Sequence, residues 1–375
     1  MSPYNLSDIY TMLDSLPARE TPFYVLDRNK LRQNCRNFRS AFGDIQIYFS
    51  VKANACPEVL KIFSEESINF DVASWGEIEV LLSLGVSSER MIYSAPSKIP
   101  RDIQKAYEAG VRTFAFDSKL EVEKLAKLAP GSKVFARLAV DNLGSDYPLE
   151  RKFGASLENC AVWMPYAKQL GLQPWGLTFH VGSQNRRPDS WARAMRQIHP
   201  LWKELREKGL DIQVIDLGGG IPGEYCKEIP TLAEIAAEID ATRCELYPPT
   251  MQFFLEPGRG LPNNAGFLVV SVINRAERGD SEWLYLDAGV FQGLDEGRNG
   301  FHYPVLSDRA GDHLKPFVLA GPTCDSSDVI MDNAMLPEDI TLGDRVFLLS
   351  TGAYTTTMQR YNGMDFPGTY FVGKE

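Results

Sequence analysis

Short apolar runs alternate with longer segments of helical spacing as far as Pro262. Eight of the runs are apolar on both faces, which is typical of buried parallel strands. In chain order they are IQIYFSV (45–51), NFDVAS (69–74), MIYSA (91–95), TFAFD (113–117), VFARLAV (134–140), GLTFHVG (176–182), VIDLGGG (214–220) and FFLEPGR (253–259). Helical patterns such as WGEIEVLLSLG and KLEVEKLAKLA lie between them. This alternation predicts an α/β fold with a closed (β/α)8 TIM-like barrel.

The pattern changes after Pro262. The runs GFLVVSVI, EWLYLDAGVF, PFVLAGPT, RVFLLSTGAY and GTYFV are short strand candidates split by turn residues, with no convincing helix between them. FYVLD (23–27) could return to this β region from the start of the chain. We therefore expect a barrel domain over residues 25–262 and a β domain built from residues 1–24 and 263–375.

Composition narrows the classes of partner. The chain has 375 residues and a formal net charge of -10, and the absence of a basic stripe argues against nucleic-acid binding. Its six cysteines include no CxxC pair, which favours free thiols in a reducing compartment. The first twenty residues lack a signal pattern, and no apolar stretch reaches membrane-spanning length. We expect a cytoplasmic protein without a membrane partner.

Polar residues gather where the predicted strands end, which in a barrel of this kind is the active face. In strand order they are Lys52, Asp71, Ser74, Ser94, Arg137, His180, Ser183, Gly218–Gly220, Glu256 and Arg259. Random placement would scatter such residues over both rims and the helices. The sequence therefore predicts one polar site at the C-terminal rim.

Each of these groups has a chemical use and a bland alternative. Lys52 delivers one amine to the rim, although most lysines simply open a solvated loop. The glycine run offers backbone N–H groups to a phosphate or is a flexible turn, and Arg259 could add a charged fork. Glu256 lies between FFL and Pro-Gly, so we expect it to be buried with a cationic partner, either a basic side chain or a protonated ring nitrogen. His180 could stack, ligate or act as a base, or be a satisfied core histidine.

Other chemistries lack their usual signatures. Only four histidines are present, without HExxH or paired-cysteine spacing, so no metal site is expected. GxSxG, P-loop and GxGxxG motifs are also missing. A lysine, a phosphate nest and a buried carboxylate on one rim indicate pyridoxal phosphate, whose aldehyde a lysine holds as a Schiff base.

The chain resembles the fold-type III pyridoxal-phosphate decarboxylases of ornithine, lysine, arginine and diaminopimelate. The matching segments, in order, are YFSVKAN, FDVASWGEI, KFG, HVGSQ, DLGGGIPG, EPGRG, AGPTCDSSD and TGAYT. They span nearly the whole chain. In this family a β domain completes the cofactor site, and a head-to-tail homodimer places each active site at the subunit interface.

The resemblance implies a role for each site residue. Lys52 would carry the cofactor, His180 would stack on its ring and Glu256 would pair with the ring nitrogen, with Asp71 and Arg137 beside Lys52. The phosphate would be held by Gly219, Gly220, Ser183, Arg259 and Tyr354. Cys324 would protonate the α-carbon and Asp325 would bind the far end of the substrate, both in the partner chain's site. Lys152 and Asp328 would form an intersubunit ion pair.

Substrate choice rests on the residues at the far end of the site. An anion at Asp325 suits a distal ammonium, and ornithine-like members of the family carry Asp there, whereas diaminopimelate enzymes carry Glu. The second acid of eukaryotic ornithine decarboxylases falls near Gly300, where this chain has none. Asp295 and Glu296 are candidate substitutes, but Arg298 could instead recruit a carboxylate or carbamoyl group, and Tyr354 would also line the substrate.

The leading hypothesis is decarboxylation of L-ornithine to putrescine in polyamine biosynthesis. Lysine, diaminopimelate and other diamino acids are the alternative substrates. A catalytically inactive regulatory homologue and an amino acid racemase are the alternatives of a different class. Lys52, Cys324 and Glu256 argue against the first of these, and Glu256 with the AGPTCDSSD turn argues against the second.

Overall fold

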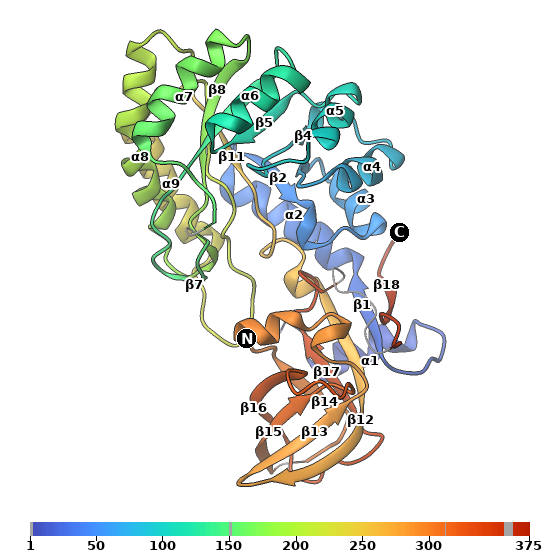
Figure 1. Ribbon diagram of the computed structural model, residues 1–375. Coiled ribbons are helices and arrows are strands. Elements are labelled where there is room, and N and C mark those ends of the chain that lie inside the picture. The colour runs from blue at the N-terminus through green and yellow to red at the C-terminus, as the bar shows by residue number, and fades with distance from the viewer. Residues whose placement is uncertain (1–2, 150–151, 312, 356–362) are drawn as a thin grey trace. The chain divides into compact units, whose positions relative to one another are not determined.

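The computed structural model describes residues 3–149, 152–311, 313–355 and 363–375 (Figure 1). The chain forms two compact units. Unit 1 comprises Met1–Asn34, Gly223–Glu228 and Gly260–Glu375, and unit 2 comprises Cys35–Pro222 and Ile229–Arg259.

Unit 2 contains a parallel barrel of eight strands. They are β2 (Gln46–Ser50), β3 (Asn69–Asp71), β4 (Met91–Ile92), β5 (Thr113–Phe116), β6 (Lys133–Leu138), β8 (Gln173–Phe179), β10 (Val214–Asp216) and β11 (Gln252–Leu255). Strand β11 returns to pair with β2, with Leu255 opposite Ile47. The remaining gap, between β4 and β5, is bridged by Tyr93, whose N–H donates to Thr113 O at 2.9 Å. The predicted (β/α)8 fold class is therefore confirmed, with one strand for each apolar run.

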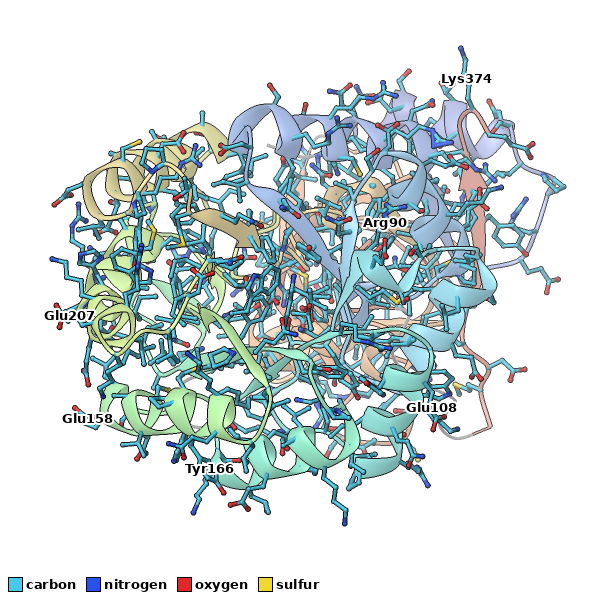
Figure 2. All side chains as sticks on the ribbon, turned by 90° about the horizontal axis from the view of Figure 1, so that it is seen from above. Arg90, Glu108, Glu158, Tyr166, Glu207 and Lys374 are labelled. Carbon is cyan, nitrogen blue, oxygen red and sulfur yellow. The ribbon has the colours of Figure 1, made fainter. Side chains whose placement is uncertain are left out.

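Helices surround these strands, as Figure 2 shows from above, with the labelled Glu108, Glu158 and Glu207 at the outer edge. The helices of unit 2 are α3 (Pro57–Glu65), α4 (Trp75–Ser83), α5 (Pro100–Glu108), α6 (Lys119–Leu128), α7 (Leu157–Gln169), α8 (Ser190–Glu207) and α9 (Leu232–Leu246). Hydroxyl side chains cap several of them, because an oxygen there accepts an otherwise unpaired N–H. Ser74, Ser118 and Ser156 do so for α4, α6 and α7, and Thr231 forms a capping box with Glu234 at α9.

Large aromatic side chains fill the lower half of the barrel. Tyr48, Phe135, Val214 and Phe254 belong to one buried cluster, against which Trp175 packs. The Phe135 and Trp175 rings stack with centroids 5.3 Å apart, and Tyr48 lies 4.8 Å from Phe254. The barrel is therefore closed from below by an apolar floor.

Unit 1 is built around one sheet in which β1 (Phe23–Asp27), β12 (Gly266–Arg278), β13 (Ser281–Leu286), β14 (Val305–Ser307), β15 (Leu314–Ala320), β16 (Val329–Pro337), β17 (Arg345–Leu349) and β18 (Gly368–Val372) take part. β14, β16 and the helix α1 (Leu6–Asp14) were not predicted from the sequence. The described residues after Pro262 contain only short 3₁₀ turns, η3 (Asn263–Ala265), η4 (Val290–Gln292) and η5 (Asp295–Asn299), and no α-helix.

Strand β1 joins the two ends of the chain within this sheet. It pairs antiparallel with β12 and parallel with β18, and Figure 1 shows the blue β1 beside the red β18. All of β1 and the start of α2 (Arg28–Phe42) lie in unit 1, whereas the sequence placed residue 25 onward with the barrel. The difference arises because the apolar residues of β1 pack on the β sheet, and Val25 belongs to the same cluster as Phe267.

No helix in the described part of the chain is both long enough and apolar enough to cross a membrane. The longest of them, α8, has 18 residues and carries arginine, lysine and glutamate along its length. None of the six cysteines, all of which lie in described segments, forms a disulfide bond.

Candidate active site

A polar layer lies directly above the aromatic floor of the barrel. Side chains two residues apart on a strand point to the same side, so the residue two positions after each floor residue also faces the inside of the barrel. Tyr48, Phe135, Val214 and Phe254 are followed in this way by Ser50, Arg137, Asp216 and Glu256. The strand period thus converts an apolar layer into a polar one at the C-terminal rim, where the sequence placed the site.

Lys52 stands at the mouth of the barrel. It lies in η1 (Val51–Ala53), which directly follows β2, and its Nζ is 3.4 Å from Oδ2 of Asp71. The Lys52 side chain is 49% exposed, while that of Asp71 is 3% exposed. Ser50 Oγ also donates to Asp71 Oδ2, at 2.7 Å. A buried, hydrogen-bonded carboxylate therefore holds an amine that still reaches solvent.

Glu256 is buried, as predicted from its sequence context, with 7% of the residue exposed. The hydroxyl of Ser94 donates to its Oε1, and among the described residues no salt bridge joins Glu256 to a basic side chain. Burial, followed by the negative charges of Asp216 and Asp71, raises the pKa of Glu256 well above its usual value. A carboxyl group in this position can form a hydrogen bond or an ion pair with a nitrogen atom of a ligand.

Asp216 is a member of this site that the sequence reading missed. It ends β10 and is completely buried, and Gly218 N–H donates to its Oδ1 at 3.0 Å. Burial raises the pKa of Asp216 to about 6. The available signal was the position of Asp216 two residues after the floor residue Val214, inside the motif DLGGG.

Glu77 was also missed. It lies in the first turn of α4, and its Oε2 accepts the N–H of Ala73 at 2.6 Å. Burial, with a smaller contribution from the charge of Asp71, raises the pKa of Glu77 to about 7, against the opposing effects of the Ala73 N–H and of Lys52. The residue lies within the segment FDVASWGEI, but on the helix that follows the strand end, so the rim argument could not reveal it.

Arg137 brings a buried positive charge to the rim. Burial lowers the pKa of Arg137, and Glu256, Asp117, Asp71 and Asp216 counteract this shift. The Arg137 guanidinium lies 5.2 Å from the ring centre of Phe153. Asp71 forms its ion pair with Lys52, and it affects Arg137 by its charge without a direct ion pair among the described residues.

His180 is held neutral. Its Nδ1 accepts the N–H of Gly182 at 3.0 Å, which places the ring proton on Nε2. Burial and the positive charges of Arg137 and Lys52 lower the pKa of His180 well below its usual value. A neutral ring suits stacking on a ligand better than it suits proton uptake.

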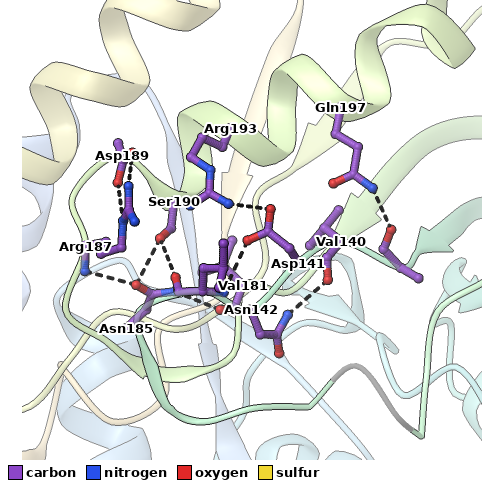
Figure 3. Close-up of polar contacts among 12 residues, drawn as sticks. Val140, Asp141, Asn142, Val181, Asn185, Arg187, Asp189, Ser190, Arg193 and Gln197 are labelled. Carbon is purple, nitrogen blue, oxygen red and sulfur yellow. Dashed lines mark hydrogen bonds and ion pairs between the residues drawn. The ribbon is translucent and has the colours of Figure 1, made fainter.

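The loops that carry His180 and Ser183 are fixed by a polar network (Figure 3). Asn142 Nδ2 donates to Val140 O, as Figure 3 shows, and it also donates to His180 O; both distances are 3.1 Å. Asn185 Nδ2 donates to Val181 O at 2.8 Å, and Ser190 Oγ donates to Asn185 Oδ1 at 2.9 Å. These bonds connect the segments after β6 and β8 to the start of α8, so the backbone beside His180 is supported from both sides.

The glycine turn after β10 forms a cradle without side chains. Gly218 adopts φ +63°, and a Cβ there would collide with Phe179 O. At Gly219 a Cβ would lie 2.9 Å from His180 Nε2 and 2.8 Å from Glu256 O. Among the hydrogen bonds of the described residues, none uses the N–H of Gly219 or Gly220. These donors are available to an anion.

Arg259 and Ser183 add side-chain donors to unit 2. Arg259 is 5% exposed, and its Nη2 donates to Ser183 Oγ at 3.3 Å. A buried guanidinium beside a hydroxyl is a strong donor set for phosphate. The amine, the buried carboxyl groups, the neutral imidazole and these donors all fit pyridoxal phosphate, and they lie on one barrel rim.

The remaining predicted residues lie in unit 1. Cys324 is exposed in the turn between β15 and β16, and Asp325 Oδ1 accepts the N–H of Ser327 at 2.8 Å. Asp328 is only 3% exposed and accepts N–H groups from Val290 and Thr323 at 2.9 and 3.1 Å. Within a single chain Asp328 therefore supports the Cys324 turn, and its ion pair with Lys152 of a partner stays a prediction.

The segment near Gly300 forms a short 3₁₀ helix. Asp295 and Arg298 pair within η5 at 3.5 Å, and Gly300 ends it with φ +79°. Arg298 is exposed, and Tyr354 has a left-handed backbone with φ +57°. The roles of Arg298 and Tyr354 toward a substrate or a phosphate stay predictions.

Comparison with known proteins identifies the family of the chain. Residues 28–262 match the family of pyridoxal-dependent decarboxylases, over their pyridoxal-binding domain. The chain is 35% identical to the lysine/ornithine decarboxylase of Selenomonas ruminantium, over 97% of this chain and 92% of the relative. It is also 30% identical to antizyme inhibitor 2 of Xenopus laevis, over 91% of this chain and 78% of the relative.

The structure leads to the same family. It superposes on the lysine/ornithine decarboxylase from Vibrio vulnificus complexed with cadaverine with a TM-score of 0.90. The two chains are 30% identical, and the match covers 99% of this chain and 100% of the other. The chain therefore belongs to the fold-type III pyridoxal-phosphate-dependent decarboxylases of basic amino acids, and pyridoxal phosphate is its cofactor.

Proposed function

We propose that this enzyme decarboxylates L-ornithine to putrescine and thereby serves polyamine biosynthesis. The observation that carries the proposal is the convergence, on one barrel rim, of the Lys52 amine, the buried Glu256 carboxyl and the donors around Gly219 and Arg259. Pyridoxal phosphate supplies an aldehyde that condenses with amines and a ring that accepts the electron pair left behind by carbon dioxide.

Lys52 is the residue assigned to the aldehyde. Its amine is half exposed and lies 3.4 Å from Asp71, so the carboxylate orients it without burying it. The same amine would also be in position to release the product. Glu256 is assigned to the ring nitrogen. Its carboxyl group lies in the polar layer and accepts a hydrogen bond from Ser94, and no basic side chain of the described residues pairs with it.

Gly219, Gly220, Ser183 and Arg259 are assigned to the phosphate. The two glycine N–H groups are available for an anion, and the Arg259 guanidinium is already turned toward Ser183. His180 is assigned to the face of the ring, since its imidazole is neutral and Gly219 lies close to its Nε2. Tyr354 is the further phosphate and substrate residue that the family pattern adds.

The substrate end of the site is assigned to a second copy of the chain in a homodimer. Cys324 would protonate the α-carbon, and Asp325 would bind the distal ammonium of the substrate. The exposure of Cys324 in the turn after β15 is compatible with this role. Arg298 would lie near the far end of the substrate, where the Asp295 carboxylate 3.5 Å away partly offsets its positive charge.

The relatives support a basic amino acid as the substrate more firmly than they support one length of its side chain. The named relatives include lysine/ornithine decarboxylases, so L-lysine is the nearest alternative substrate. The similarity to an antizyme inhibitor raises a regulatory, inactive alternative. Lys52, Glu256 and Cys324 are all present, which favours an active enzyme, and Glu256 beside the ring nitrogen favours decarboxylation over racemisation.

A substrate panel tests the proposal. Carbon dioxide release would be measured with L-ornithine, L-lysine, L-arginine, diaminopimelate and a neutral amino acid, with Lys52→Ala protein as the blank. The expected result is the highest kcat/KM with L-ornithine. Faster release from lysine would identify lysine, which is one methylene longer, as the substrate. A preference for a neutral or dicarboxylic amino acid would refute the role of Asp325. No release from any of them would favour the regulatory alternative.

A further inference from the structure

Two buried carboxyl groups meet between β10 and β11. Parallel pairing places Asp216 opposite Phe254, and Glu256 N–H donates to Gly218 O at 2.8 Å just beyond the strands. The side chains of Asp216 and Glu256 hydrogen-bond to each other. Ionised carboxylates only accept hydrogen bonds, so this contact requires a proton on one of the two groups.

The neighbouring donors indicate which group holds that proton. Gly218 N–H donates to Oδ1 of Asp216, and a hydrogen bond from the Thr178 side chain also stabilises the ionised form, while Oδ2 is buried without a hydrogen-bond partner among the described residues. A protonated Glu256 can supply the missing donor. Burial and the charge of Asp216 raise the pKa of Glu256 well above its usual value, and burial also raises that of Asp216. The backbone N–H that Asp216 accepts from Gly218 makes Asp216 the better anion of the two.

The other charged groups around the pair come from the neighbouring strands. Arg137 on β6 faces both carboxyl groups, and its positive charge favours their ionised forms. Asp71 at the end of β3 faces both and disfavours ionisation. Lys52 pairs with Asp71, and His180 is neutral, so neither cancels the effect of Asp216 on Glu256.

We propose that Asp216 is a positioning residue that keeps a proton on Glu256 in the cofactor-free enzyme, through a buried hydrogen bond from the Glu256 carboxyl to the Asp216 carboxylate. Its consequence for the cofactor rests on the proposed function, in which Glu256 faces the ring nitrogen. The single proton of a neutral Glu256 is then already donated to Asp216, so the ring nitrogen can take it only when that hydrogen bond breaks, whereas an ionised Glu256 requires the nitrogen to arrive with its own proton.

Two substitutions with opposite effects test the proposal. Asp216→Asn removes the negative charge and keeps the shape, so Glu256 should ionise at a lower pH. Ser94→Ala removes a hydroxyl that stabilises ionised Glu256, so Glu256 should ionise at a higher pH. A general loosening of the site would expose Glu256 in both variants and shift it in one direction.

The measurement is carbon NMR of the full-length chain, labelled at the glutamate carboxyl carbon and stripped of pyridoxal phosphate. Glu256 is identified by the signal that Glu256→Gln lacks. The expected result is a protonated Glu256 at about pH 7 in the unaltered chain. In Asp216→Asn the pH at which Glu256 ionises should be lower by at least about one unit, which is a tenfold loss of proton affinity. An ionised Glu256 at about pH 7 in the unaltered chain, or shifts of the same sign in both variants, would overturn the proposal. Should Asp216→Asn not fold, an ionised Glu256 at about pH 7 in the unaltered chain would still overturn the proposal.

Adding pyridoxal phosphate back separates this proposal from the assignment of Glu256. If Glu256 faces the ring nitrogen, the dissociation constant of pyridoxal phosphate and its pH profile change in Glu256→Gln, and the profile moves in Asp216→Asn. If affinity and profile are the same in Glu256→Gln as in the unaltered chain, the assignment of Glu256 to the ring nitrogen fails. The carboxyl pair itself then stands or falls on the NMR result alone.

Discussion

Gly219→Ala should weaken cofactor binding without unfolding the chain. The added Cβ would lie 2.8 Å from Glu256 O and 2.9 Å from His180 Nε2, both closer than side-chain carbons normally approach, so the cradle must open. Gly219 does not require a positive φ, so the substitution tests this close approach and not backbone strain. Overpacking of this kind costs about 1 to 3 kcal/mol.

Because the displaced groups belong to the cofactor site, we expect that cost to fall mainly on the complex. It corresponds to a dissociation constant for pyridoxal phosphate that is higher by about 5-fold to 150-fold. Spectroscopic titration of cofactor-free protein with pyridoxal phosphate measures it. Gly76→Ala in α4 is the matched control, since the nearest atom to its Cβ would be Ser74 Oγ at 3.8 Å. Equal affinity in the two variants, with equal melting temperatures, would refute the cradle at Gly219.

Three further predictions concern the amine, the dimer and a buried acid. Lys52→Ala should abolish the covalent adduct that borohydride traps between protein and cofactor, and an unchanged adduct would exclude Lys52 as the attachment site. Mixing inactive Lys52→Ala with inactive Cys324→Ala chains should restore about a quarter of the sites if subunits exchange at random, whereas proven exchange without recovery would argue against a shared site. Burial raises the pKa of Glu77 from about 4.5 to about 7, so folding favours its protonated form and this contribution is lost as pH rises between those values. Relative to Glu77→Gln, the free energy of unfolding of the unaltered chain, measured with urea, should fall by up to about 3 kcal/mol over that range, and parallel curves would contradict the shift.

The barrel was predictable because its strands are buried on both faces. Such strands must be apolar throughout, and runs such as TFAFD and VFARLAV therefore stand out from helices with one polar face. The edges of the β unit were harder to read. Strand β14 has only three residues, Val305–Ser307, and β16 contains Asp332 and Asn333 within an otherwise apolar pattern, so neither gives a clear alternation.

The boundary at β1 could not be predicted from its own residues. FYVLD reads equally well as a barrel strand or as a strand of a β sheet, since both bury it. Its place was decided by pairing with β12 and β18, which lie more than 200 residues away in the chain. A short apolar run carries no information about its distant partner.

By itself, the sequence determined the chemistry of the rim. The period of two along each strand and the rule that barrel sites lie at the C-terminal ends were enough to bring together Lys52, Asp71, Arg137, His180 and Glu256. The same period of two would also have revealed Asp216, which follows Val214 by two residues, whereas Glu77 lies in the first turn of a helix, where neither rule applies.

Only the tertiary structure decided how protons are distributed among these groups. Ser94 and Glu256 are separated by 162 residues, and Asp216 meets Glu256 only because β10 and β11 lie side by side. The pKa of a carboxyl group depends on its burial and on the charges within a few ångströms, which are properties of the folded arrangement. The sequence therefore named the acids, and the fold determined that Glu256 is the one placed to keep its proton.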